Sequence, residues 1–305
     1  MSFKRILLAA AVASVLVVGF VPMAQAAKVD AGVCIERHDH PGPEGRLRDL
    51  VEAPKVDRLS GWIAKHPKLA ARAEAAAAAG HTITIQTYVH VIREDTTVAG
   101  GNIPDRWIRD QISVLNRSFS GATGGAATGF QFALDGTTRT TNAKWFEVFA
   151  TGTDKAMKSA LKVGGLQTLN IYTANLGHNL LGWAYLAQDA AKVGALDGVV
   201  VHYQSLPGGG FEIYSEGDTA THEVGHWLDL FHTFDGGCRR GDFIDDTAPE
   251  ASPAFNCPEG RDTCVAGGLD PITNFMDYTQ DSCMFEFTAG QAVRMQQAWT
   301  AFRAP

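Results

Sequence analysis

The chain has 305 residues, 45% of them hydrophobic, and a formal net charge of −7 with a pI near 5.8. That length and apolar content are enough for one or two compact domains with a proper core. No basic patch stands out in the sequence, which argues against nucleic acid as a partner.

The N-terminus predicts export from the cell. Lys4 and Arg5 precede an apolar run from Ile6 to Phe20, and Ala24-Gln25-Ala26 then supplies a small-residue cleavage site. This pattern is typical of a secretory signal peptide over residues 1–26. A membrane anchor is the alternative, but the apolar run is short for a bilayer span. We therefore expect a secreted protein with no membrane contact after signal cleavage.

Residues 27–80 predict a pro-segment or linker. Residues 70–80 are nearly all alanine, a composition with high helix propensity but little bulk to bury. The folded domain is expected to begin at His81 and to continue to residue 305.

Residues 81–203 alternate between strand and helix patterns. A period of two marks strands over 83–91 and 130–134, and an apolar stripe marks a helix that begins at Pro104. A helix over 154–163 and a strand over 169–172 follow. This order predicts crossover units on a mixed sheet, in an α+β fold. Two more strands are expected, a buried one over 198–203 and one over 180–187 that lies either at the sheet edge or inside the core.

The motif that carries chemistry lies in residues 219–232. It contains H-E-x-x-H, with His222, Glu223 and His226. Positions i and i+4 share one face of a helix, so both imidazoles can reach one ion, and zinc suits such nitrogen ligands best. Glu223 would lie beside the metal and take a proton from water. An amphipathic core helix with incidental histidines is the alternative. Asp218 or Thr219 is the expected N-cap.

A third histidine follows at the right distance. His232 lies six residues after His226, the spacing of the long zinc signature H-E-x-x-H-x-x-G-x-x-H. The glycine of that signature ends the helix in a sharp turn, but here the position holds Asp229. Since Asp tolerates a left-handed backbone better than most residues, we expect strain of roughly 1 kcal/mol and an intact site. One hypothesis is that the Asp229 carboxylate bonds a nearby backbone or histidine N–H.

Asn274-Phe275-Met276-Asp277-Tyr278 looks like the Met-turn that underlies the zinc of metzincins. This turn, the run H-E-V-G-H-W-L-x-L-F-H-T-F and the G-G-C after it together resemble the pappalysin family of metzincin proteases. The resemblance is to its secreted bacterial and fungal branch, the cytophagalysin and ulilysin types. It covers roughly residues 81–305.

The resemblance implies a metzincin-type zincin fold. In that fold a mixed, twisted sheet carries the active-site helix above a loop-rich C-terminal subdomain. The upper subdomain would cover residues 81–232, and the lower one, with the Met-turn and disulfides, residues 233–305. The strand over 180–187 would then pair with an extended substrate by strand addition.

The implied activity is that of a zinc endopeptidase that cleaves protein or peptide substrates, and we expect a monomer. The zinc ligands would be His222, His226 and His232, with Glu223 as general base. Met276 would form an apolar floor under the imidazoles. The Tyr278 hydroxyl would stabilise the oxyanion of the tetrahedral state, or, alternatively, Tyr278 would only pack beneath the site.

Two competing hypotheses remain. One is a catalytically impaired secreted zinc-binding protein of the same fold, which only Asp229 favours. The other is a different zinc hydrolase acting on small peptides or amides. The resemblance also makes Asp281 a candidate for the wall of a pocket that prefers basic residues, and cleavage specificity stays open.

Five cysteines follow the signal peptide. Four of them lie after the zinc motif, and an even cluster in an exported chain predicts two disulfides. A second metal site is the alternative. The spacing permits three pairings, and the resemblance implies Cys238–Cys264 and Cys257–Cys283. The fifth, Cys34, would bind the zinc and keep the enzyme latent, as in some metzincins, or would be a free or intermolecular thiol.

A second cation is also predicted. Asp242, Asp245, Asp246 and Thr247 offer hard oxygen ligands close together, and the resemblance supports calcium there. A solvated acidic loop is the alternative. Beyond this loop, Thr288-Ala289-Gly290-Gln291 predicts a capping box at the start of a last helix.

Overall fold

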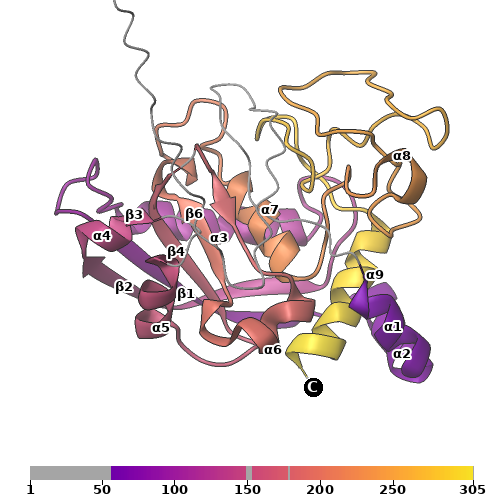
Figure 1. Ribbon diagram of the computed structural model, residues 1–305, viewed down its shortest axis with the longest axis horizontal. Coiled ribbons are helices and arrows are strands. Elements are labelled where there is room, and N and C mark those ends of the chain that lie inside the picture. The colour runs from indigo at the N-terminus through magenta and orange to yellow at the C-terminus, as the bar shows by residue number, and fades with distance from the viewer. Residues whose placement is uncertain (1–55, 149–152, 178, 305) are drawn as a thin grey trace, which may run out of the picture.

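The computed structural model describes residues 56–148, 153–177 and 179–304 (Figure 1). The predicted signal peptide over 1–26, the first part of the predicted pro-segment and Cys34 all lie outside the described residues. Among the helices of the described part, none has the length and apolar character needed to cross a bilayer.

The strands are few and the helices mostly short. The strands are β1 (Ile83–Arg93), β2 (Phe130–Thr141), β3 (Glu147–Val148), β4 (Leu169–Leu176), β5 (Gly182–Trp183) and β6 (Val199–His202). The α-helices are α1 (Arg58–Lys65), α2 (Pro67–Ala78), α3 (Asp105–Phe119), α4 (Ala143–Phe146), α5 (Thr153–Leu161), α6 (Ala190–Val193), α7 (Asp218–Trp227), α8 (Gly237–Arg240) and α9 (Ala289–Ala298). Shorter helical turns are η2 (Ala187–Asp189), η3 (Gly194–Leu196), η4 (Tyr203–Ser205) and η5 (Trp299–Arg303).

The strands form one mixed sheet, which confirms the predicted α+β class. Its order is β2-β1-β4-β6-β5, and β3 adds to β4 off this path. Every pairing is parallel except that of β5 with β6. Parallel neighbours need crossover connections, and α3 supplies the one between β1 and β2. The strands and helices predicted for residues 81–203 are all present, but β2 continues to Thr141, well past the predicted end at residue 134.

The strand expected over 180–187 is shorter than predicted but does lie at the sheet edge. Only Gly182 and Trp183 pair with β6. Since β6 begins at Val199, it offers few partners, and the chain beyond Trp183 turns away. The backbone N–H of Gln188 then bonds to Asp229 instead of to a strand.

One core joins the two predicted subdomains. Helix α7 packs on β5, β6 and α3 (Figure 1). The same apolar cluster contains Ile85 of β1, Val224 of α7 and Met295 of α9. The last helix begins at the predicted capping box, in which Thr288 and Gln291 bond to each other's backbone.

Residues 58–78 are packed on the domain. Helices α1 and α2 lie against α9, seen as indigo beside yellow in Figure 1. Leu59, Ala70 and Ala73 are buried there. Alanines allow two helices to approach closely, so little bulk is needed. The packed part of the chain therefore begins well before His81.

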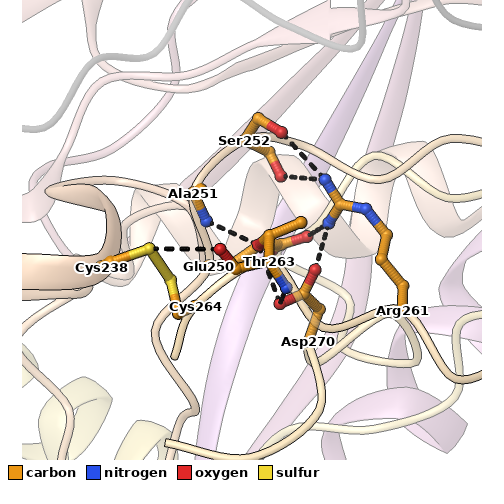
Figure 2. Close-up of a disulfide and its surroundings, with 8 residues drawn as sticks. All are labelled: Cys238, Glu250, Ala251, Ser252, Arg261, Thr263, Cys264 and Asp270. Carbon is orange, nitrogen blue, oxygen red and sulfur yellow. Dashed lines mark hydrogen bonds and ion pairs between the residues drawn. A yellow bond between two sulfur atoms is a disulfide. The ribbon is translucent and has the colours of Figure 1, made fainter. Parts of the chain in front are cut away.

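The segment after α7 is loop-rich, as the resemblance implied. Its disulfides pair Cys238 with Cys264 and Cys257 with Cys283, the implied pairing. Beside the first disulfide, Arg261 bridges Glu250 and Asp270 (Figure 2). These covalent and ionic links give a region with little regular structure a fixed shape.

Candidate metal centre

Three imidazoles meet at the end of helix α7. The Nε2 atom of His226 lies 3.1 Å from that of His222 and 3.2 Å from that of His232. All three rings are buried. Within the described residues, no other group of three or more His, Cys, Asp or Glu side chains converges in this way.

Each ring has an acceptor at its other nitrogen. His222 Nδ1 lies 2.7 Å from the Phe275 carbonyl oxygen, and His226 Nδ1 lies 2.8 Å from that of Leu230. A carbonyl only accepts, so Nδ1 carries the proton in both rings. The Asp235 carboxylate lies 3.3 Å from His232 Nδ1. Three Nε2 lone pairs are thereby directed at one point.

This arrangement fits a cation. Two neutral imidazoles protonated at Nδ1 have no hydrogen to share between their Nε2 atoms. Lone pairs about 3 Å apart in a buried site repel unless a positive charge lies among them. Metal-binding histidines characteristically donate the other ring N–H to a carbonyl or carboxylate. The residues present are therefore suited to zinc.

Asp229 forms the turn that returns His232 to the cluster. Its φ is +79°, in the left-handed region, and its N–H bonds to the His226 carbonyl at 2.8 Å. Its carboxylate accepts the Gln188 N–H at 3.0 Å and an Arg294 N–H at 2.9 Å. Burial raises the pKa of Asp229 to about 6, and the Arg294 charge opposes that rise. Asp at the glycine position therefore preserves the cluster.

Glu223 is directed toward the sheet edge. The residue is buried on α7, beside His222 in sequence. A Cβ atom on Gly182 of β5 would come within 2.4 Å of Glu223 Oε1. The absence of a side chain at residue 182 thus makes room for the carboxylate next to the edge strand.

The predicted Met-turn lies directly under the helix. Met276 is fully buried, and a Cβ atom on Gly225 would come within 2.4 Å of its Sδ. Tyr278 follows, with its ring centroid 5.1 Å from that of His232 and 5.9 Å from that of His222. The Met276 carbonyl accepts the Thr233 N–H at 3.3 Å. The turn is thus fastened to the segment that carries the third histidine.

The predicted N-cap of α7 was wrong by one residue. The cap is Gly217, with φ +103°, and Asp218 is the first helical residue. Gly217 has no side chain to cap with, so Asp281 supplies the acceptor. Its Oδ2 accepts the N–H groups of Glu216, Gly217 and Asp218 at 2.9, 3.2 and 3.4 Å. Asp281, considered for a substrate pocket, therefore holds the start of the helix.

The predicted calcium ligands are only partly brought together. Asp242 and Thr247 are buried, whereas Asp245 is exposed. Asp246 bonds Thr288 and Gly290 at the start of α9. Burial raises the pKa of Asp242 to about 7, despite the Ile244 N–H that its carboxylate accepts.

Sequence reasoning missed several residues of this centre. Asp235 lies three residues after His232, a local spacing that could have been noticed. Arg294 stands between Val293 and Met295 in the sequence, which is only a weak signal of a buried ion pair. Nothing local marks Gly182 or the capping role of Asp281.

Similarity to known proteins covers most of the chain. Residues 212–300 match the M43 peptidase family, described as "Pregnancy-associated plasma protein-A". An "Extracellular metalloprotease 1" from Coccidioides posadasii is 44% identical over 226 residues, 73% of this chain and 79% of that protein. An "Extracellular metalloprotease" from Pyricularia oryzae is 42% identical over 261 residues, 84% of this chain and 87% of that protein.

Solved structures show the same architecture. A promirolysin variant from Tannerella forsythia superposes with a TM-score of 0.68 at 29% identity, over 84% of this chain and 95% of that one. Mature mirolysin in complex with a cleaved peptide gives a TM-score of 0.62 at 34% identity, over 71% of this chain and 91% of that one. The described sheet, α7 and the loops after it are therefore an arrangement that other proteins share.

Proposed function

The chain belongs to the pappalysin (M43) family of extracellular metalloproteases, and from this premise we propose that it is a zinc endopeptidase with Glu223 as its general base. The observation that carries the proposal is the convergence of three Nε2 atoms beside a buried carboxylate at a sheet edge. His222, His226 and His232 would hold the metal. Bound zinc would supply a Lewis acid that makes water more acidic and polarises a peptide carbonyl.

Glu223 would move the proton. Its carboxylate is buried on α7, and Gly182 leaves it space beside β5. In the proposed reaction Glu223 accepts a proton from the attacking water and then delivers it to the leaving amine nitrogen. Glu223 and the three histidines are buried, and charges act more strongly in such surroundings than in water.

Edge strand β5 would align the substrate. It is the last strand in the sheet order and pairs on one side only, with β6. An extended peptide can add to such an edge through main-chain hydrogen bonds. Mature mirolysin is seen with a cleaved peptide, which supports protein or peptide substrates here.

Tyr278 would stabilise the oxyanion. Its ring centroid lies 5.9 Å from that of His222 and 5.1 Å from that of His232, and this closeness to the cluster supports the role. A hydroxyl donor aimed at developing negative charge typically contributes about 10²- to 10³-fold in rate.

Hydrolysis of casein by the purified secreted protein tests the proposal. Activity should disappear with a chelator and return with zinc. Glu223→Gln should abolish it while zinc content, measured by atomic absorption, stays at one per chain. The exposed Glu259→Gln serves as the matched control and should cleave casein like the wild type. Zinc binding without cleavage would instead support the catalytically impaired alternative.

Calcium is proposed only as a structural ion near Asp242 and Thr247. Both residues are buried. Burial raises the pKa of Asp242, and a bound cation would stabilise the ionised form of its carboxylate. Calcium should raise the Tm of the wild type and leave that of Asp242→Asn unchanged. Equal responses of the two proteins would remove this proposal.

A further inference from the structure

Arg294 of α9 lies between two buried carboxylates from distant parts of the chain. Its Nη2 donates to Asp229 Oδ2 at 2.9 Å and to Asp57 Oδ1 at 3.1 Å. Its Nη1 donates to Asp57 Oδ2 at 3.3 Å. The side chain of Arg294 is 7% exposed, that of Asp229 is 0% exposed and that of Asp57 is 4% exposed. A guanidinium holds such a geometry better than an ammonium, because its donors form a rigid fork.

Arg294 also acts on the backbone of the metal-binding turn. Its Nε donates to the Asp229 carbonyl oxygen at 2.7 Å. Both the side chain and the main chain of residue 229 are therefore fixed by one guanidinium. Residue 229 lies between the second and third histidines, and its backbone is in the left-handed region. Holding that conformation determines where His232 lies.

Asp57 brings the N-terminal helices into this network. Its carboxylate accepts the N–H groups of Leu59 and Ser60 and so caps α1. Leu59 is buried on the same helix, in a small cluster with Ala298 of α9. The docking of α1 and the conformation of the turn therefore share one side chain, Arg294.

We propose that Arg294 is a positioning residue that couples helix α1, through Asp57, to the metal-binding turn at Asp229. The coupling rests on the proposed function, because it acts on the histidine cluster assigned to zinc. Zinc binding and α1 docking then favour each other, as any two events linked through one element must.

Zinc affinity measured by competition with a coloured chelator tests the coupling in the full secreted chain. Arg294→Met keeps the aliphatic bulk and removes the fork, and Asp229→Asn keeps a residue that tolerates positive φ. Arg294→Met removes the guanidinium from both Asp57 and Asp229, and Asp229→Asn removes the negative charge that faces Arg294. Each should weaken zinc binding about tenfold or more, as loss of a ligand's supporting partner does. The loss of zinc affinity in the double variant should be smaller than the sum of the two single losses, because both substitutions remove the same Arg294–Asp229 contact.

Ile85→Val is the control for general destabilisation. Ile85 is buried in β1 and takes no part in the network. It should lower the Tm and leave zinc affinity at the wild-type value. Wild-type zinc affinity in both single variants, or losses that simply add in the double variant, would overturn the proposal.

Hydrogen exchange gives a second readout if a single variant fails to fold. Amides of α1 should exchange faster in the wild type once zinc is removed with a chelator. In Asp57→Asn that response should be reduced by half or more, while α3 behaves as in the wild type. If the exchange rates of the α1 amides in the wild type are the same with and without zinc, the coupling is overturned. A wild type that takes up no zinc at all would instead contradict the proposed function.

Discussion

Gly182 and Glu223 lie so close that a single added carbon atom at residue 182 would come 2.4 Å from Glu223 Oε1 and 2.8 Å from its Cδ. Gly182→Ala should therefore displace the carboxylate without unfolding the domain, since the far end of a Glu side chain can move. We expect kcat for casein to fall roughly 10- to 100-fold, less than the 10²- to 10⁴-fold that loss of a whole general base costs, with zinc content unchanged.

Gly165→Ala is the matched control for that variant, because a Cβ there would meet nothing within 4 Å. It should retain full activity. If Gly182→Ala has the same kcat as the wild type, then either the added methyl group does not displace the Glu223 carboxylate or Glu223 is not the general base.

Gly225 has a comparable relationship to the Met-turn. A Cβ atom there would come within 2.4 Å of Met276 Sδ, in a site with no exposure. Gly225→Ala should lower the free energy of unfolding by about 1–3 kcal/mol, the usual cost of overpacking a core. Urea denaturation of the metal-free protein measures it. In a Met276→Ala background the same substitution should cost clearly less, and equal costs in both backgrounds would contradict the predicted clash.

Asp281 should matter for stability more than for substrate preference. Its Oδ2 accepts three N–H groups at the start of α7, where the helix dipole also favours a negative charge. Asp281→Ala should destabilise the protein by about 1–2 kcal/mol, as loss of a helix cap does. Urea denaturation beside Asp262→Ala, at an exposed Asp, checks this. A shift in cleavage preference without loss of stability would favour the pocket role.

The stability of the domain should fall as pH rises because of two buried acids. Burial raises the pKa of Glu250 to about 9 and that of Asp277 to about 7, and the Asp277 charge adds to the rise at Glu250. A carboxyl whose pKa is raised in the folded state binds a proton more tightly there than when unfolded. Its stabilising effect is complete below about pH 4, the ordinary range of such groups, and is lost as pH rises through the raised value.

Glu250→Gln should therefore make the Tm less dependent on pH between pH 5 and 9. Thermal melts across that range measure the slope. The exposed Glu259→Gln should keep the wild-type slope. An unchanged slope in Glu250→Gln would place the titrating group elsewhere.

The parts of this molecule that sequence predicted well are those governed by local geometry. The offset of four between His222 and His226 fixes a shared helix face, and the six residues to His232 fix the return of the chain. The strand periods and the capping box at Thr288 are equally local. For these features, neighbouring residues alone determine the geometry.

The parts that sequence did not predict depend on contacts between distant residues. Arg294 and Asp229 are 65 positions apart, as are Asp281 and Glu216. No periodicity relates such pairs. The packing of α1 and α2 was missed for another reason, because their alanine-rich sequence suggests little to bury, yet small side chains suit close contact with α9.

Arg303 constrains when, during synthesis of the chain, helix α7 can complete its packing. It donates from Nε to the Trp227 carbonyl at 2.8 Å, across 76 residues, and its guanidinium lies 3.5 Å from the centre of the Trp227 ring. Protein chains are made from the N-terminus onward, so this contact forms only after the 76 residues that follow Trp227 have been made. The helix that bears His222 and His226 therefore completes its packing only after the chain has been made through residue 303.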